Sequence, residues 1–87
     1  MNTTFFYLLA EFETLTPTLG QISKKYLGIE PSTANYRANI GKLPLPTFRT
    51  VETQKAPRLV HIEDLAEMID KGRAAGKKEF EHFNKRG

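Results

Sequence analysis

Apolar residues recur at helical spacing near the start of the chain. Within residues 3–12, Phe5, Leu8, Leu9 and Phe12 lie at i, i+3, i+4 and i+7, which is one face of an α-helix. The aromatic residues there also suit a strand, because aromatic side chains are frequent in strands. We favour a helix whose apolar face belongs to the protein core.

A second amphipathic stretch, residues 18–27, is bounded by helix start and stop signals. Thr18 and Gln21 have the spacing of a capping box, and Gly28 can adopt the left-handed conformation that ends a helix. These features predict a short helix. The side chains expected to face inward are Leu19, Ile22 and Tyr26.

Another short helix is predicted over residues 31–41. Pro31 suits a first helical turn, and Glu30 or Ser32 can accept hydrogen bonds from the free N–H groups there. Gly41 can end this helix. The side chains expected to face inward are Ala34, Ala38 and Ile40. Two short helices joined by a tight turn are typical of a helix-turn-helix, whose second helix usually enters the DNA major groove.

The pattern after the second helix is typical of strands. Two prolines in LPLP, residues 43–46, force an extended path. Residues 47–51 and 58–62 are then predicted to be two strands joined by a polar turn, residues 52–57. A β-hairpin directly after a helix-turn-helix is a wing. We therefore expect a mainly α fold with a small β-hairpin, a winged helix-turn-helix.

The third helical stretch is residues 63–74, with acidic side chains in its first turn and basic ones near its end, the signs that the helix dipole favours. Its buried stripe is expected to contain Leu65, Ala66 and Ile69. The basic tail, residues 76–87, is interpreted as a frayed helix or a disordered arm. We expect one DNA-binding domain over residues 1–75, followed by this tail.

Charge is unevenly distributed along the chain. The net charge is +3. Residues 21–58 carry seven basic and two acidic side chains, and residues 71–87 carry six basic and two acidic side chains. Two basic segments indicate a polyanion as partner. The chain has no Cys, which excludes disulfides and thiolate sites and fits a reducing cytoplasm.

Catalysis is not expected. The candidate groups are His61, His82, Ser23 and Ser32, and their spacing fits neither a metal site nor a catalytic triad. We therefore expect no enzyme activity, no cofactor and no metal. The longest apolar run, residues 5–10, is too short to span a bilayer, and no secretory signal is evident. We expect an unprocessed cytoplasmic protein that binds no membrane.

Several short motifs occur in a defined order: MNTTFFYLLAEF at the start, YLGIEPSTAN and KLPLPTFR in the middle, then QKAP and VHIEDLAEMID. Together they resemble the pyocin activator (PrtN-like) family of phage and prophage regulators, within the MerR-like winged helix-turn-helix group that includes AlpA-type regulators and phage excisionases. The resemblance runs from residue 1 to about residue 75. It implies a small transcriptional activator that binds double-stranded DNA in a bacterial or phage-infected cell.

The expected DNA contacts lie on the second short helix and on the wing. Asn35 and Asn39 are one turn apart, and asparagine can read adenine through a bidentate pair. Ser32 and Thr33, near the helix start, suit phosphate. Wing side chains would clamp the backbone or the minor groove. The expected contacts are Ser32, Thr33, Asn35, Tyr36, Arg37, Asn39, Lys42, Arg49, Gln54, Lys55 and Arg58.

Two other functions stay open at this point. An excisionase that binds and bends DNA at an attachment site would use the same fold, and a protein-binding anti-repressor would use the aromatic residues near both ends. We also expect a homodimer or a cooperative oligomer on DNA. The residues considered for that contact are Phe5, Phe6, Phe80 and Phe83.

Overall fold

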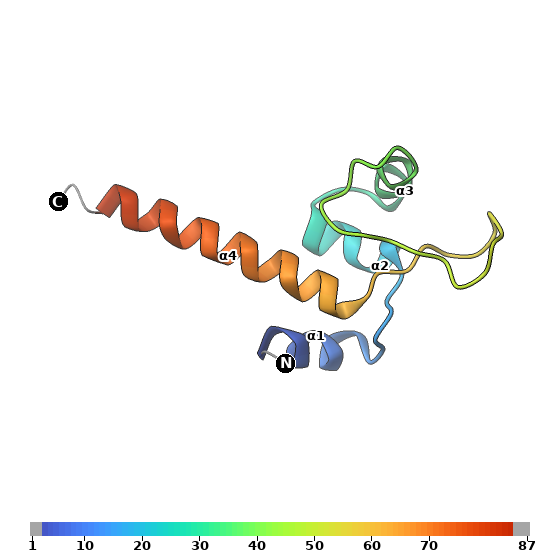
Figure 1. Cartoon of the computed structure of the whole chain (residues 1–87), viewed down its shortest axis with the longest axis horizontal. Helices are drawn as coiled ribbons and strands as arrows, with labels where there is room; N and C mark the ends of the chain where they lie inside the picture. The colour runs from blue at the N-terminus through green and yellow to red at the C-terminus, as the bar shows by residue number, and fades with distance from the viewer. Residues whose placement is uncertain (1–2, 85–87) are drawn as a thin grey trace.

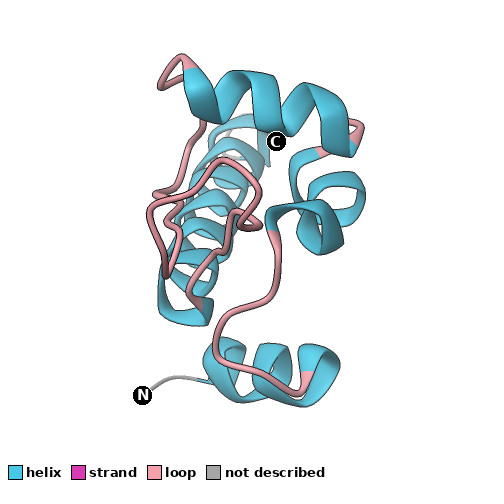
Figure 2. Ribbon diagram, turned by 90° about the vertical axis from the view of Figure 1, so that its right-hand side faces the viewer, coloured by secondary structure: helices cyan, strands magenta, loops and turns pink. Residues whose placement is uncertain are grey.

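The computed structural model describes residues 3–84, which form helices joined by loops (Figures 1 and 2). The elements are α1 Thr3–Phe12, α2 Leu19–Ile22, the π-helical turn η1 Ser23–Leu27, α3 Pro31–Asn39 and α4 Ile62–Asn84. The molecule measures 55 × 28 × 16 Å, and its long dimension follows α4, which projects beyond the other helices (Figure 1). The mainly α fold expected from the sequence is therefore confirmed.

The first turns of α4 lie at the centre of the core. They bury Ile62, Leu65 and Ala66, and the last two belong to the predicted stripe. On one side α4 is packed by α1, the helix expected over residues 3–12, while α2 and α3 lie on the other side (Figure 1). The buried apolar side chains of the described residues are Phe5, Leu8, Pro17, Leu19, Ile22, Ala34, Leu45, Val60, Ile62, Leu65 and Ala66.

The predicted capping box is present at the start of α2. The Thr18 hydroxyl accepts a hydrogen bond from the Gln21 N–H at 3.1 Å, and the Gln21 side-chain oxygen accepts one from the Thr18 N–H at 2.8 Å. The helix then widens into η1 and ends at Gly28, whose φ is +70°. Ser23, the first residue of η1, is buried, and its hydroxyl donates to the Gly20 carbonyl at 3.1 Å. The expected first helix is confirmed, with a π-helical second half.

The start of α3 is at Pro31, as predicted, but no side chain caps it. Glu30 is the N-cap residue, and its carboxylate instead lies 3.4 Å from the Lys24 ammonium. The expected cap by Glu30 or Ser32 is therefore wrong.

The end of α3 falls at Asn39, and Gly41 follows it with a φ of +69°. Ala34 is buried and Ala38 is half-buried, as expected. Ile40 is 48% exposed, so its expected inward orientation is wrong. The reason is that Ile40 comes six residues after Ala34, which is about 240° further round the helix axis, so helical spacing turns it away from the buried side.

The β-hairpin expected over residues 47–62 is not formed, and residues 3–84 contain no regular strand. Phe48 and Leu59 make a single bridge, in which the N–H of each donates to the carbonyl of the other at 3.0 and 2.7 Å. The next hydrogen-bonded pair on either side would include Pro46 or Pro57. Because proline has no N–H, neither neighbouring pair can form both bonds, and the ladder stops.

The other edge of residues 58–62 is bonded to the chain before α2. The Val60 N–H donates to the Pro17 carbonyl at 2.9 Å. The Ile62 N–H donates to the Leu15 carbonyl, also at 2.9 Å. This segment therefore lies between two extended stretches, and it leads directly into α4.

The helix predicted over residues 63–74 is the beginning of a longer one. Gly72 and Gly76 do not interrupt α4, and beyond Gly72 its side chains are exposed. Residues 85–87 of the expected tail lie outside the described residues, and the expected domain division after residue 75 stays a prediction. No helix within residues 3–84 is long and apolar enough to cross a membrane.

A polar cluster on the surface joins α1 to η1. The Tyr26 hydroxyl donates to the Glu11 carboxylate at 2.6 Å, and the Lys25 ammonium lies 3.1 Å from the other carboxylate oxygen. The hydrogen bond from Tyr26 is the main cause that lowers the pKa of Glu11 below its ordinary value. The hydrogen bond to Glu11 raises the pKa of Lys25, and partial burial raises the pKa of Tyr26.

Replacing Tyr26 with Phe keeps the ring and removes this donor, so the pKa of Glu11 should rise towards its ordinary value. A carboxyl with a lowered folded-state pKa stabilises the fold above its unfolded-state pKa and loses that effect as pH falls. The wild type should therefore be more stable than Tyr26→Phe at neutral pH, and the difference should shrink as pH falls through the folded-state pKa of Glu11. Urea unfolding followed by circular dichroism across the acidic range measures this difference.

The matched control is Tyr7→Phe, since Tyr7 lies on α1 with its side chain exposed. It should lose no pH-dependent stability. A loss in Tyr26→Phe that is equal at neutral and acidic pH would show that the hydroxyl acts independently of the Glu11 charge.

Candidate nucleic-acid interface

Side chains from three parts of the chain line one groove of about 250 Å³. Its walls are the start of α2, one face of α3, and the loop of residues 47–60, which we call the 47–60 loop. The groove brings together five of the side chains expected to contact DNA: Asn35, Asn39, Arg49, Gln54 and Arg58.

The exposed face of α3 carries four of the expected contacts. With about 3.6 residues per turn, Ser32, Asn35, Tyr36 and Asn39 lie on the side opposite the buried Ala34. All four are exposed, and Tyr36 keeps 63% of its surface accessible. This face offers amides and hydroxyls without a formal charge.

Other expected contacts lie away from the groove. Arg37 lines a separate apolar groove between α3 and α4, together with Leu43 and Ile69. Thr33 is half-buried, and Lys42 is exposed just after α3. The structure therefore does not gather every predicted α3 contact on one surface.

The guanidinium of Arg58 is engaged within the protein. One terminal nitrogen donates to the Thr47 hydroxyl at 3.1 Å, and the other donates to the Asn39 side-chain oxygen. Its Nε is buried and has no hydrogen-bond partner among the described residues. Arg58 thus connects the 47–60 loop to the end of α3.

The tip of the 47–60 loop is held by local bonds. Arg49 Nε donates to the Ala56 carbonyl at 3.0 Å, which closes the loop across its base. The Lys55 N–H donates to the Thr53 hydroxyl at 3.2 Å. The Gln54 and Lys55 side chains are exposed at the tip.

Sequence reasoning missed three residues that shape this groove. Thr18 and Gly20 line it from the start of α2, and Thr47 fixes Arg58 from the loop. The capping box marked Thr18 as a helix start, but it carries no information about which distant elements face it. Thr47 and Arg58 are 11 positions apart, so no local sequence pattern predicts the contact between them.

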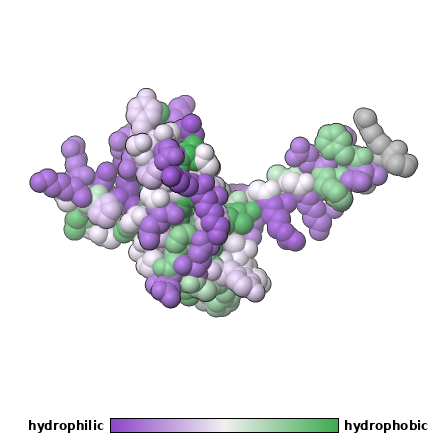
Figure 3. All heavy atoms as spheres, turned by 180° about the vertical axis from the view of Figure 1, so that it is seen from behind, coloured by the Kyte–Doolittle hydropathy of each residue, from purple (hydrophilic) through white to green (hydrophobic). Residues whose placement is uncertain are grey.

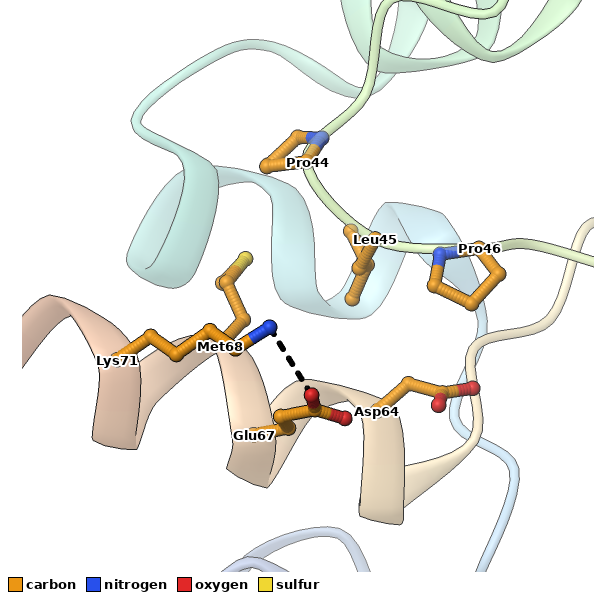
Figure 4. A pocket seen from close by; sticks show the side chains of 7 residues that line it. All are labelled: Pro44, Leu45, Pro46, Asp64, Glu67, Met68 and Lys71. Carbon is orange, nitrogen blue, oxygen red and sulfur yellow. Dashed lines mark ion pairs between the residues drawn. The ribbon is translucent and has the colours of Figure 1, made fainter.

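A second hollow lies between the LPLP segment and α4 (Figure 4). Pro44 and Pro46 line it from above, and the acidic side chains Asp64 and Glu67 line it from α4. Glu67 pairs with Lys71 at 3.0 Å. Carboxylates repel a polyanion, so this hollow is not a candidate for nucleic acid.

Neither histidine forms a metal or catalytic cluster within the described residues. His61 Nδ1 accepts a hydrogen bond from the Glu63 N–H at 3.0 Å, which caps the start of α4. The His82 ring lies against Phe83, with ring centres 5.7 Å apart. In residues 3–84, no group of three His, Cys, Asp or Glu side chains could hold a metal ion.

Comparison with known proteins gives one match. The family model described as pyocin activator protein PrtN matches residues 4–76, most of the chain. Neither the curated proteins nor the solved structures contain a match.

Proposed function

Because the chain belongs to the pyocin activator protein PrtN family, we propose that it binds double-stranded DNA directly and reads it with α3. The family implies a transcriptional activator of pyocin genes. The DNA-binding mode is our inference from the groove. The main supporting observation is that asparagine side chains of α3 and arginine side chains of the 47–60 loop line the same groove.

Base reading is assigned to the exposed face of α3. The major groove is wide enough for an α-helix and displays a different donor and acceptor pattern for each base pair. The side-chain amides of Asn35 and Asn39 lie on this face, and Tyr36 adds a hydroxyl and an aromatic ring. Ser32, near the helix start, would bind phosphate with the N-terminal amide groups.

Backbone contacts are assigned to the cations of the 47–60 loop. Lys55 and Gln54 lie exposed at its tip, and Arg49 lines the groove beside α3. With α3 in the major groove, these side chains would contact the flanking phosphates or the adjacent minor groove. Lys42, just after α3, would add one more phosphate contact.

We also propose that two copies associate through the projecting part of α4. Phe80 and Phe83 are 66% and 67% exposed there, and apolar atoms gather near the end of the projecting helix (Figure 3). Helical spacing places both on the same face as Ile69, Gly72 and Gly76. Phe5, considered from the sequence, is buried against the core and is not available.

We favour a second copy of the chain as the partner of Phe80 and Phe83, because the same face of α4 borders an apolar groove into which these rings could pack. An apolar groove of about 410 Å³ lies beside Ile69 and Gly72. In an antiparallel pair centred on Gly76, Phe80 lies opposite Gly72 of the second copy, and Phe83 lies opposite its Ile69. Both glycines leave open space around their Cα atoms, so the aromatic rings fit there.

The size of this contact lies at the lower end of the range for specific interfaces. A phenylalanine buries about 150–250 Å², and two-thirds of each ring is still exposed here, so four of them can bury about 400–670 Å² more. The receiving surfaces bury a similar area, and the sum of about 800–1,300 Å² reaches the lower end of the roughly 1,200–2,000 Å² of a specific interface. In a two-fold symmetric dimer, each contact of Phe80 and Phe83 with the second copy occurs twice.

The DNA-reading proposal is tested by electrophoretic shifts with the full chain at several salt concentrations. Asn35→Ala should weaken binding to the preferred site by about 5- to 150-fold and leave binding to random DNA unchanged. Lys55→Ala should weaken binding to every sequence alike and reduce the salt slope by about one. The control is Lys78→Ala, an exposed lysine far along α4.

Unchanged affinity in both variants, with the wild type bound, would refute this interface. The DNA target comes from protection mapping on the source genome. Protection upstream of structural genes supports activation, whereas repeated sites beside an attachment site, with bending, would indicate an excisionase. The absence of any salt-dependent DNA affinity would indicate a protein-binding role.

The association proposal is tested by sedimentation and by cross-linking. Phe80→Ala combined with Phe83→Ala should shift the wild-type dimer to monomer, while Tyr7→Ala, an exposed aromatic residue on α1, should not. The chain has no Cys, so single cysteines report geometry cleanly. Gly76→Cys lies on the proposed two-fold axis and should form a dimer disulfide on oxidation.

The cross-linking control is Ala74→Cys, which lies on the opposite face of α4 by helical spacing. It should stay monomeric on a non-reducing gel. Equal cross-linking of the two variants, or a wild type that sediments as a monomer at all concentrations, would contradict association through this face.

A further inference from the structure

The amide orientation of Asn39 is fixed by its partner. Arg58 donates a hydrogen bond to the Asn39 Oδ1. An arginine side chain has five donors and no acceptor, so the atom of the Asn39 amide that faces it must be the oxygen. The Nδ2 group of Asn39 is therefore turned away from Arg58.

Arg58 itself is held in place from two sides. Its second terminal nitrogen donates to the Thr47 hydroxyl at 3.1 Å, and its Nε is buried. Moving the guanidinium away from Asn39 would also disturb the Thr47 contact. Asn35 lies one turn earlier on the same face of α3 and stands outside this network.

Base recognition by asparagine depends on this orientation. A bidentate pair with adenine needs both amide atoms at the base edge, because Oδ1 accepts from N6 and Nδ2 donates to N7. At Asn39 the oxygen is turned towards the protein, so only the Nδ2 donor is presented. A donor alone can pair with N7 or O6 of guanine, N7 of adenine or O4 of thymine, whereas cytosine presents a donor, N4. Without Oδ1 the second bond to adenine N6 is lost, and with it the preference for adenine over guanine.

We propose that Arg58 is a positioning residue that sets the base preference of Asn39. By holding Oδ1, it makes Asn39 a donor-only reader that disfavours cytosine and does not select adenine through the bidentate pair. Asn35 keeps both amide atoms for the base edge. This inference rests on the proposed function, and it replaces the phosphate contact expected for Arg58 from the sequence.

The test is selection of binding sites from randomised double-stranded DNA with the full chain. Asn39→Ala identifies the base pair that Asn39 reads, because preference is lost at that position. In the wild type this position should disfavour cytosine and show no preference for adenine over guanine. Arg58→Met should release the amide and shift that position alone towards adenine, by about 5- to 150-fold in relative affinity.

Two controls separate positioning from a general structural effect. In the Asn39→Ala background, adding Arg58→Met should leave the base profile unchanged. Arg58→Lys keeps one donor and should retain part of the wild-type preference. A loss of fold would weaken binding at all positions, whereas the proposal predicts a change at one base pair.

A second variant covers the case in which Arg58→Met does not fold. Asn39→Asp keeps an oxygen for Arg58 and replaces the Nδ2 donor with an acceptor. The preference at the same position should then move to cytosine and adenine, the bases that present an amino donor in the major groove.

The outcomes distinguish this inference from the proposed function. Adenine preference in the wild type at the Asn39-dependent position would overturn the inference while DNA binding stands. An unchanged profile in a folded Arg58→Met or Asn39→Asp variant would overturn it too. A wild-type chain that shows no sequence preference would overturn the reading role of α3, and the inference with it.

Discussion

The geometry of the candidate interface depends on residues 58–62, which are hydrogen-bonded on both edges. One edge bonds to the chain before α2 and the other to Phe48. Val60 is fully buried in the core, and Arg58 extends to α3. One short segment contacts the start of α2 and the loop through backbone bonds, and the end of α3 through the Arg58 side chain. These contacts together set the separation of α3 from the loop. The same segment continues directly into α4, so the residues that line the groove are joined to the core helix without a linker.

Two prolines limit how far this pairing extends. Pro46 and Pro57 flank the Phe48–Leu59 bridge and withhold the donors that a longer ladder needs. Beyond the bridge, the loop depends on the bond from Arg49 to the Ala56 carbonyl and on its own turn. A segment held by few bonds opens at a low free-energy cost. Under the proposed function, the base of the loop keeps its distance from α3 while its tip adjusts to the DNA backbone.

The parts of the fold that the sequence predicts are those decided within a few residues. The capping box and the glycine that ends the first helix are of this kind, since Thr18 contacts Gln21 and Gly28 contacts Ser23. The bridge at Phe48 depends on a register that no local pattern shows, and so the effect of the two prolines could not be seen. The orientation of Arg58 depends on Asn39, 19 residues away. The continuation of α4 through two glycines was also hidden, because each costs only about 1 kcal/mol and the neighbouring alanines and lysines favour a helix.

Under the proposed function, the distribution of cations would connect DNA reading with self-association. The exposed face of α3 has no formal charge, and Arg37 lies at a different groove. Arg49 and Arg58 each use a donor within the protein, which leaves fewer cations directed only at phosphate. Since neutralised phosphates supply most of the affinity for random DNA, one copy would bind such DNA weakly. Two copies on adjacent half-sites would double both the phosphate contacts and the base contacts. Association through α4 would therefore raise the affinity for a paired target far more than the affinity for an isolated half-site.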